Sequence, residues 1–298
     1  MPPLKLGVIG LSPGNGHPYS WSAIFNGYDP QQMENCGFPV IPLYLARQRF
    51  PDDAIAEARV THCWAQSGDI ARHLAGAALI PNVVDRFTDM LGEVDGVLLA
   101  RDDAETHLEF AAPFLEAGVP IYIDKPLALS SAEAVRLLDL QRYPGQLFSC
   151  SALRYAREFQ LPDAERARLG RLRQIHATVP KDWDKYAVHV IEPALLLAGR
   201  SGTIGRTRVW RTEDSTTLAA SLGDGLQLLV STVGAAQSPL ALRLMGELGW
   251  TDLVFQDAFS AFRSALSEFV QGILHRDVRI EPAFMLEVVG LIEAGRAP

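Results

Sequence analysis

The chain has little of several features that mark particular protein classes. Only three cysteines, Cys36, Cys63 and Cys150, occur among 298 residues, so we expect reduced thiols in a cytoplasmic protein and no disulfide framework. No apolar run approaches the ~18 residues of a membrane span, and the start, MPPLKLGVIG, lacks the pattern of a secretory signal. No set of His, Cys, Asp and Glu has metal-ligand spacing, so no metal is expected.

The chain also has fewer positively charged than negatively charged residues. The chain has 27 Lys and Arg against 35 Asp and Glu, which gives a formal net charge of −8. A field of this sign repels phosphate backbones and anionic lipids, so we expect neither nucleic acid nor a membrane as a partner. Hydrophobic residues make up 48% and charged residues 21%, which excludes a disordered chain. The length predicts about two domains.

Residues 1–150 alternate short apolar runs with helical patterns. This alternation predicts βαβ units and a doubly wound parallel sheet of the dinucleotide-binding Rossmann type. Residues 28–58 contain four prolines and give no clear assignment. The expected strands are residues 4–10, 59–65, 82–84, 94–100, 120–123 and 146–152, and the expected helices are residues 20–27, 69–79, 104–117 and 130–140.

Residues 151–298 differ in character and predict a second domain of α+β type, for substrate binding and oligomerisation. Gly223 and Gly225 mark a hairpin turn, and apolar residues at helical spacing predict a helix over 259–273. The bare face of a mainly antiparallel open sheet is expected to be buried in a homodimer or homotetramer. The strands are expected around residues 172–180, 206–212, 216–222, 226–234 and 240–247.

The stretch GVIGLSPGNGH places a glycine-rich turn directly after the first strand. Gly10 fits the first position of the dinucleotide fingerprint G-x-G-x-x-G, but Ser12 stands at the second, and Gly14 and Gly16 straddle the third. The loop alone is equally consistent with a cofactor site and with a flexible turn. The cofactor interpretation adds two neighbouring residues to the candidate contacts, Asn15 and His17, although His17 equally fits an aromatic-packed helix start.

The end of the strand at 59–65 bears on cofactor choice. NAD sites usually carry an acidic residue there, which accepts a hydrogen bond from the ribose 2′-hydroxyl. In this chain no carboxylate follows until Asp69. We therefore expect NAD or NADP with a slight preference for NADP, whose 2′-phosphate would lie near Ser67 and Arg72.

Residues 94–134 carry the most specific pattern. A strand, a short loop, His107 opening a helix, an Ala-Gly turn and a second strand lead to Asp124-Lys125-Pro126. This order resembles the family of glucose–fructose oxidoreductase, inositol dehydrogenase and rhizopine catabolism proteins, in which the last motif reads Glu-Lys-Pro. In this chain Asp124 replaces the glutamate.

The resemblance implies roles for the matched residues. Lys125 would be catalytic, because an ammonium partly withdrawn from water can hydrogen-bond a sugar hydroxyl and stabilise the developing alkoxide. The alternative is a solvent-exposed lysine in a turn, with no catalytic role. Arg154 and Tyr155 follow the strand at 146–152, where the family often has an arginine and an aromatic residue, and are expected to bind substrate. Further candidate cofactor contacts are Arg101, His107 and Asp124.

The stretch WDKYAVHVIEPALLLAG occupies the place of the family's second catalytic element. His189 matches the proton-accepting histidine, but Lys185 stands where the family has an aspartate. Pro193 predicts a helix that begins near 189–192 or is kinked, so Lys185 and His189 need not share a face. Asp184 is a candidate for substrate binding, and Tyr186 is a spare acid or binding residue.

The resemblance implies an NAD(P)-dependent oxidoreductase that transfers hydride at a hydroxyl-bearing carbon of a sugar, cyclitol or sugar nucleotide. Two alternatives stay open. One is a redox-neutral lyase or hydrolase that retains its cofactor. The other is a non-catalytic protein that senses a nucleotide or a sugar, which Ser12, Lys185 and the missing strand-end acid favour. Titration with both dinucleotides discriminates the sensor from the enzymes.

Overall fold

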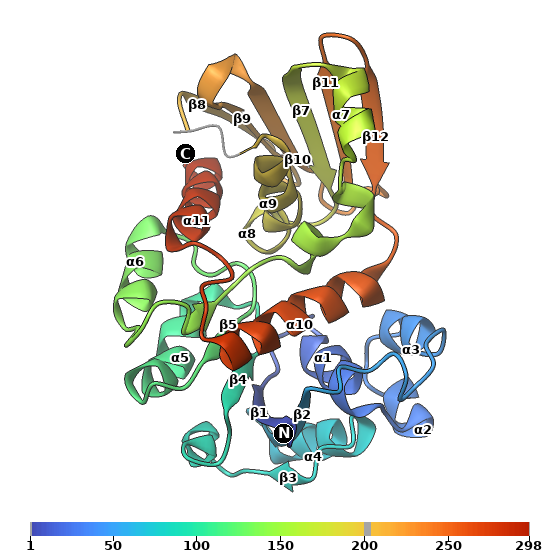
Figure 1. The fold of residues 1–298 in the computed structure, drawn as a ribbon, viewed down its shortest axis with the longest axis vertical. Coiled ribbons are helices and arrows are strands. Elements are labelled where there is room, and N and C mark those ends of the chain that lie inside the picture. Colours follow the sequence, from blue (N-terminus) through green and yellow to red (C-terminus); the bar gives the residue numbers. More distant parts are fainter. Residues whose placement is uncertain (1, 200–203, 298) are drawn as a thin grey trace. The chain divides into compact units, whose positions relative to one another are not determined.

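The computed structural model describes residues 2–199 and 204–297. The chain divides into two compact units, and it leaves the first unit and later returns to it. Each unit is described by itself below (Figure 1). The first unit comprises Met1–Ala128, Val135–Ser149 and Phe262–Pro282, and the second comprises Leu129–Ala134, Cys150–Ala261 and Ala283–Pro298.

The first unit is built on a six-stranded parallel sheet with the order β3-β2-β1-β4-β5-β6. The strand order reverses at β1, and ligands of open α/β sheets bind beyond the carboxyl ends of the strands at such a point. The predicted doubly wound sheet is confirmed, although its last strand is shorter than expected. The strands are β1 (Leu4–Ile9), β2 (Ala58–Trp64), β3 (Asn82–Val83), β4 (Gly96–Leu99), β5 (Ile121–Ile123) and β6 (Leu147–Phe148).

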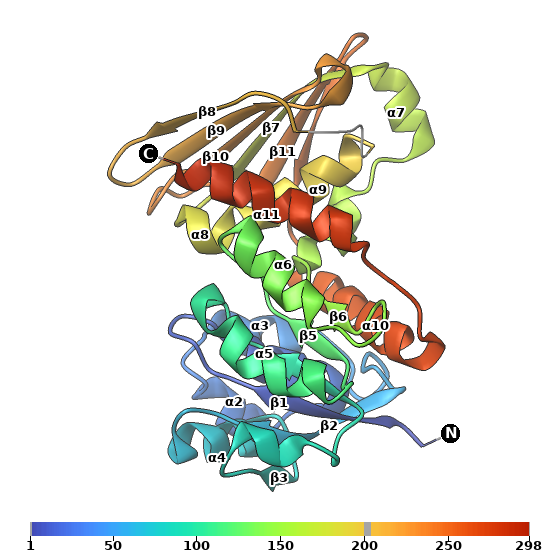
Figure 2. The same cartoon turned by 90° about the vertical axis from the view of Figure 1, so that its left-hand side faces the viewer.

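Helices cover both faces of this sheet (Figure 2). On one face, Trp21 stacks on Tyr122 with ring centroids 4.6 Å apart, and Phe269 meets the same tyrosine at 5.8 Å. The first helix begins three residues earlier than predicted, and residues 28–58 contain two short helices. The helices are α1 (His17–Asn26), α2 (Pro30–Glu34), α3 (Val40–Leu45), α4 (Gly68–Ala77), α5 (His107–Glu116), α6 (Ser131–Asp139) and α10 (Ala258–His275), with 3-10 turns η1 (Phe87–Met90) and η2 (Ala104–Thr106); α6 and α10 each continue into the second unit.

The second unit contains a six-stranded sheet with the order β12-β11-β7-β10-β9-β8. All neighbours are antiparallel except β7 and β10, so the predicted mainly antiparallel sheet and its hairpin are confirmed. The sixth strand, β12, was not predicted. The strands are β7 (Leu172–Val179), β8 (Thr207–Arg211), β9 (Thr216–Ser221), β10 (Gln227–Thr232), β11 (Ala241–Gly246) and β12 (Trp250–Val254).

The helices α9 and α11 lie on one face of this second sheet (Figure 2). Strand residues alternate between buried and partly exposed positions, which is the pattern of a sheet with one covered face. Trp210 and Trp250 are exposed, at 56% and 60%. No helix in the described part of the chain combines the length and the apolar character that a membrane crossing needs. The helices are α7 (Asp163–Leu169), α8 (Trp183–Tyr186), α9 (Val188–Leu197) and α11 (Pro282–Arg296), with 3-10 turns η3 (Ala152–Tyr155), η4 (Arg157–Phe159) and η5 (Gly223–Gly225).

Candidate functional site

The glycines of the loop after β1 are required for different reasons. A Cβ on Gly10 would lie 2.4 Å from the ring of Pro18, and a Cβ on Gly16 would lie 2.7 Å from the ring of Phe38. Close packing therefore explains both of these glycines. Gly14 instead has a φ of +81°, and nothing lies within 4 Å of the position of its Cβ. Gly14 is thus the loop glycine whose backbone is open to a ligand.

The serine at the second fingerprint position is turned into the protein. Ser12 Oγ donates to Asp102 Oδ1 at 2.7 Å. The other oxygen of Asp102 lies 3.5 Å from Nζ of Lys125, and both side chains are buried. Because these residues follow β1, β4 and β5, the three loops meet at the carboxyl edge of the parallel sheet. Lys125 is therefore an enclosed ammonium at the carboxyl edge of the sheet.

Asp124 connects the glycine-rich loop to the segment that carries Lys125. Its carboxylate accepts from Asn15 Nδ2 at 2.8 Å, faces His17 Nδ1 at 2.6 Å and accepts from the backbone N–H of Lys125 at 2.8 Å. Burial by itself raises the pKa of Asp124, but His17 and Lys125 beside it outweigh burial and lower the pKa below its usual value. Asp124 is therefore ionised and fixes the loop.

Two further predicted cofactor contacts hold the neighbouring loop in place. His107 is fully buried, and its two ring nitrogens lie 3.0 Å from the carbonyl oxygen of Leu127 and 2.9 Å from that of Arg101. The guanidinium of Arg101 pairs with Asp103 at 2.5 Å and donates to the carbonyl of Leu11. Both side chains thus act on the protein's own backbone, so they shape the loop around any ligand.

The carboxyl end of β2 contributes a residue that the sequence did not single out. Gln66 Oε1 accepts from the backbone N–H of Leu11 at 2.8 Å, which joins this strand end to the glycine-rich loop. Ser67 precedes α4, and its hydroxyl makes no cap hydrogen bond to that helix. The exposed side chain of Arg72 pairs with Asp69 at 2.5 Å. A hydroxyl and an exposed guanidinium that is paired with a carboxylate therefore follow this strand.

The residues of the first unit fit a dinucleotide. Gly14 leaves backbone open where a phosphate approaches such a loop, and the loop lies at the point where the strand order reverses. The carboxylates beside the loop are compensated, because Asp102 faces the ammonium of Lys125 and Asp124 has three nitrogen partners. Among the described residues, no group of three or more His, Cys, Asp or Glu is arranged to hold a metal ion.

In the second unit, His189 has a hydroxyl partner. Its Nδ1 lies 2.8 Å from Ser151 Oγ, and the side chain is largely buried. Lys185 lies on α8 and His189 on the separate helix α9, as the sequence allowed, and Pro193 is tolerated inside α9. The position that holds an aspartate in the family therefore supplies no carboxylate to the ring here, and Ser151 faces it instead.

Arg154 is paired inside the second unit. Its guanidinium donates to Glu192 Oε1 at 2.6 Å, and the other carboxylate oxygen accepts from the N–H of Ser151 at 2.6 Å. Burial alone would lower the pKa of Arg154, but the adjacent Glu192 raises it above its usual value. The guanidinium also lies 5.1 Å from the ring centroid of Phe284 and 5.3 Å from that of Tyr155. The predicted substrate contact is thus a buried ion pair that joins η3 to α9.

The remaining predicted residues of the second unit also have protein partners. Tyr186 accepts a hydrogen bond from Nζ of Lys181, whose ammonium lies 4.3 Å from the centre of the tyrosine ring. Asp184 pairs with Arg296 at 3.2 Å. These contacts hold α8 to its surroundings, and Tyr186 is bonded to a lysine that lines the cavity described next.

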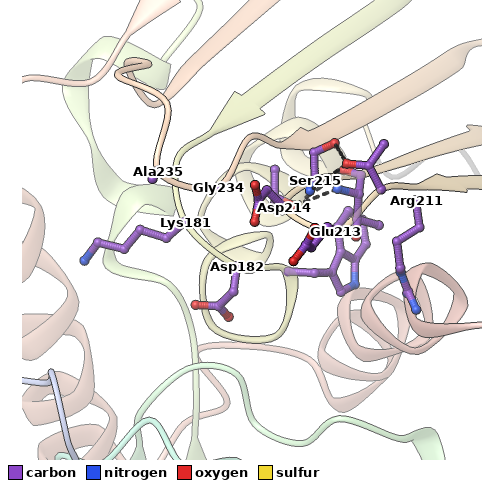
Figure 3. Close-up of a pocket in the computed structure, with 12 residues that line it drawn as sticks. Lys181, Asp182, Arg211, Glu213, Asp214, Ser215, Gly234 and Ala235 are labelled. Atoms are coloured by element: carbon purple, nitrogen blue, oxygen red, sulfur yellow. Dashed lines mark hydrogen bonds between the residues drawn. The ribbon is translucent and has the colours of Figure 1, made fainter.

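A cavity of about 480 Å³ lies next to α8 in the second unit. Asp182, Glu213 and Asp214 line it together with hydroxyl-bearing residues, and Lys181 and Arg211 extend away on opposite sides (Figure 3). The sequence does not predict this cavity, because turn residues of this kind have no diagnostic spacing. The other lining residues are Trp183, Thr212, Ser215, Thr216, Thr232, Gly234 and Ala235.

Comparison with known proteins agrees with the fold of the first unit. Residues 42–151 match the sequence model of a family described as an oxidoreductase family with an NAD-binding Rossmann fold, GFO_IDH_MocA. The expected family resemblance is confirmed. The segment carries the fold of an NAD-binding oxidoreductase family, which agrees with the expected cofactor class, NAD or NADP. No curated protein matches the chain significantly.

Solved structures share the fold over almost the whole chain. Apo scyllo-inositol dehydrogenase from Lactobacillus casei has 15% identity and a TM-score of 0.73, covering 98% of this chain and 96% of that one. Biliverdin reductase from Synechocystis with biliverdin and NADP+ has 14% identity, a TM-score of 0.68 and coverages of 98% and 97%. GenD2 from gentamicin A biosynthesis with NAD has 16% identity, a TM-score of 0.74 and coverages of 99% and 93%. At these identities the likeness shows the fold alone.

Proposed function

We propose that the chain is an NAD(P)-dependent oxidoreductase that acts on a hydroxyl-bearing carbon of a sugar, a cyclitol or a sugar nucleotide. The observation that carries the proposal is the placement of Lys125. Its ammonium is enclosed at the carboxyl edge of β5, 3.5 Å from Asp102, in the same network as the glycine-rich loop. The family match over residues 42–151 supports the cofactor, and inositol dehydrogenases are among the solved structures that share the fold.

Lys125 has the chemistry that oxidation of an alcohol requires. A bound nicotinamide supplies the hydride acceptor. The ammonium donates a hydrogen bond to the substrate oxygen and stabilises the negative charge that develops there as the C–H bond breaks. Asp102 orients the ammonium, and the N–H of Lys125 bonded to Asp124 fixes the backbone from which the side chain extends.

The second unit supplies groups suited to a polyhydroxylated molecule. The cavity next to α8 is lined by carboxylates and hydroxyls, including Glu213, Asp214 and Ser215, which accept hydrogen bonds from or donate them to sugar hydroxyls. His189 stays a predicted acceptor of the hydroxyl proton. Its Nδ1 faces the hydroxyl of Ser151 at 2.8 Å, and this contact helps to orient the ring.

Replacement of Lys125 by methionine tests the proposal. We expect the Lys125→Met variant to lose turnover by about 10²–10⁴-fold with a panel of inositols, aldoses and sugar nucleotides, while it keeps its fold. Lys5→Met, at an exposed lysine of the same unit, is the matched control. Unchanged turnover in Lys125→Met would remove Lys125 from the mechanism. Calorimetric titration that detects binding of neither NAD(H) nor NADP(H) would refute the enzyme and favour the sensor.

The same purified protein can be used to distinguish the dehydrogenase from the redox-neutral alternative. Cofactor that remains bound through purification and is not consumed during conversion of a glycoside would favour a lyase or hydrolase. Net formation of reduced nicotinamide, followed by its absorbance, would favour the dehydrogenase. The measurement requires a substrate panel that includes both free sugars and glycosides.

The second sheet also supports self-association. We propose a homodimer or homotetramer in which the face that bears the exposed Trp210 and Trp250 meets a second copy of the chain. Light scattering at micromolar concentration tests this expectation. If the wild-type chain is a monomer, the proposal is contradicted. If the wild-type chain is an oligomer and a variant with both tryptophans replaced by lysine is a monomer, the proposal is supported.

A further inference from the structure

The first unit contains a carboxylate–imidazole pair that the family resemblance does not predict. His17 is the first residue of α1, and its Nδ1 lies 2.6 Å from Oδ2 of the buried Asp124. We propose that His17 and Asp124 form the proton-transferring pair of the reaction, with Nε2 of His17 as the atom that accepts the substrate's hydroxyl proton. This inference rests on the proposed function and names a residue for its proton step.

The hydrogen bonds determine which nitrogen of His17 carries a proton. An ionised carboxylate only accepts hydrogen bonds, so the contact at 2.6 Å requires a proton on Nδ1. In the neutral ring Nε2 then has a free lone pair and is a base. This is the arrangement in which a buried carboxylate holds a catalytic imidazole in the correct tautomer and stabilises the imidazolium that forms.

The surroundings orient the ring further. It stacks on Trp21 with centroids 5.0 Å apart and planes inclined by 12°, and it meets Phe262 edge-on at 5.0 Å. The side chain of His17 is 17% exposed, whereas that of Asp124 is fully buried. Within the described residues of the first unit, no hydrogen bond is formed to Nε2. The ring is therefore fixed on the carboxylate side and accessible on the other.

The charged side chains described around His17 and Asp124 come from two loops of the first unit. Lys125 follows Asp124 directly and donates its backbone N–H to the same carboxylate, and Asp102 acts on Asp124 from the loop after β4. From α1 and α10 the groups packed against the ring are Trp21 and Phe262, which carry no charge. The pair is thus next to the lysine proposed to hold the substrate oxygen, within one network of residues.

The alternative proton acceptor, His189, has a hydroxyl beside its Nδ1. The resemblance places a carboxylate four residues before His189, but Lys185 occupies that position and the hydroxyl of Ser151 faces the ring. A hydroxyl does not stabilise an imidazolium as an ionised carboxylate does. The imidazole of His17 contacts an ionised carboxylate directly, whereas the hydrogen bond described for His189 is to a hydroxyl, and the carboxylate contact favours His17 as the proton acceptor.

The proposed step balances. The substrate's carbinol loses its hydroxyl proton to Nε2 of His17 and its C–H hydride to oxidised nicotinamide, and a C=O bond forms. The imidazolium keeps its Nδ1–H bond to Asp124. It then releases the proton from Nε2 to water, which restores the neutral ring for the next turnover.

A spectroscopic test needs no substrate. In ¹⁵N NMR spectra of the full chain, with His17 assigned from its loss in His17→Asn, we expect a protonated Nδ1 and an unprotonated Nε2 in the neutral ring. In Asp124→Asn this tautomer preference should weaken, because an amide can also donate to the ring. A neutral ring protonated at Nε2 in the wild-type chain would overturn the pair, whichever substrate the enzyme uses.

A kinetic test separates proton transfer from anchoring of the loop. His17→Asn keeps a donor near Asp124 but removes Nε2, so we expect kcat to fall about 10²-fold or more and the acid limb of its pH profile to disappear. Asn15→Ala removes another donor to the same carboxylate, and His73→Asn removes a second histidine with one bonded ring nitrogen, at 2.8 Å from the hydroxyl of Tyr19. His73→Asn should keep the wild-type kcat and pH profile, whereas Asn15→Ala should keep the acid limb of the profile even where loosening of the loop lowers kcat.

The outcomes distinguish this inference from the proposed function. Equal losses in His17→Asn and Asn15→Ala with an unchanged pH profile would show that His17 only anchors the loop, and would overturn the inference. Loss of the acid limb in a His189→Asn variant, but not in His17→Asn, would assign the step to His189 and overturn it as well. Failure of the wild-type chain to bind either dinucleotide refutes the proposed function, and the tautomer measurement still decides the pair.

Discussion

The two units use buried charge in different ways. In the first, Asp102 and Asp124 bond to Ser12 and Asn15, which are 90 and 109 residues away in the sequence, so the carboxylates join loops at the edge of a sheet. In the second, Glu192 bonds Arg154 across 38 residues and joins η3 to α9 inside the unit. The first arrangement borders an open glycine and a partly exposed histidine, whereas the second is enclosed. Buried carboxylates thus join loops at the edge of a sheet in one unit and join helical segments inside the other.

Breaking the enclosed pair should have the largest effect on stability. Glu192→Gln leaves the guanidinium of Arg154 buried without a counter-ion, and we expect the free energy of unfolding in urea to fall by about 3–5 kcal/mol. The control is the double variant Arg154→Met/Glu192→Leu, which replaces both charges with apolar side chains. It should recover most of the loss, and a double variant as unstable as the single one would show that the ion pair is not the cause.

The carboxylate at the sheet edge should make stability depend on pH. His17 and Lys125 hold the pKa of Asp124 below the ordinary 3.8, so its contribution is present above that value and is lost as pH falls through the lower folded value. Asp124→Asn should therefore cost about 1.5–3 kcal/mol at neutral pH. Below about pH 3.8 the difference in free energy of unfolding between Asp124→Asn and the wild-type chain should become smaller. Urea unfolding of both chains across this pH range measures that difference. A difference that increases in acid would contradict the lowered pKa of Asp124.

Sequence patterning predicted most of the regular elements, because apolar periodicity reports directly on burial. The parallel strands of the first unit, the hairpin of β9 and β10, and α10 follow from it. The strand β12 escaped prediction because partly exposed residues alternate with exposed ones over Trp250–Val254, so it lacks a buried row. The parallel pairing of β7 with β10 joins strands about 50 residues apart, and no local signal reports such a pairing.

Candidate site residues could be named from the sequence only where they lie close together in it. The Asp124-Lys125-Pro126 motif made Lys125 a candidate, but it did not indicate the contact of Lys125 with Asp102 in the loop after another strand. His17 was named as a cofactor contact, and its bond to Asp124 depends on two segments 107 residues apart in the chain. A histidine next to the glycine-rich loop and an aspartate ending a strand were the available signals. The fold is needed to bring them together.

Glycine substitutions sharpen the distinction between packing and ligand access. Gly16 has an ordinary φ of −93°, but a Cβ there would collide with Phe38 and with Ile41, at 2.6 Å from its terminal methyl. We expect Gly16→Ala to cost about 1–3 kcal/mol of stability through overpacking. Gly14→Ala meets nothing and should cost about 1–2 kcal/mol through its positive φ, together with weaker dinucleotide binding. Equal binding by wild type and Gly14→Ala would show that no phosphate approaches Gly14.

The smallest expected effect concerns cofactor choice at the end of β2. Arg72 is 68% exposed and paired with Asp69, so its attraction for a 2′-phosphate is screened by water and is worth about 0.2–1 kcal/mol. Arg72→Ala should therefore weaken NADP binding by less than about fivefold and leave NAD binding unchanged, as measured by calorimetry. Arg49→Ala is the matched control, since Arg49 is 81% exposed and also pairs with an aspartate, Asp53. Equal weakening of both dinucleotides would show that Arg72 does not face the 2′-position, and the preference for NADP would then depend on Ser67 alone.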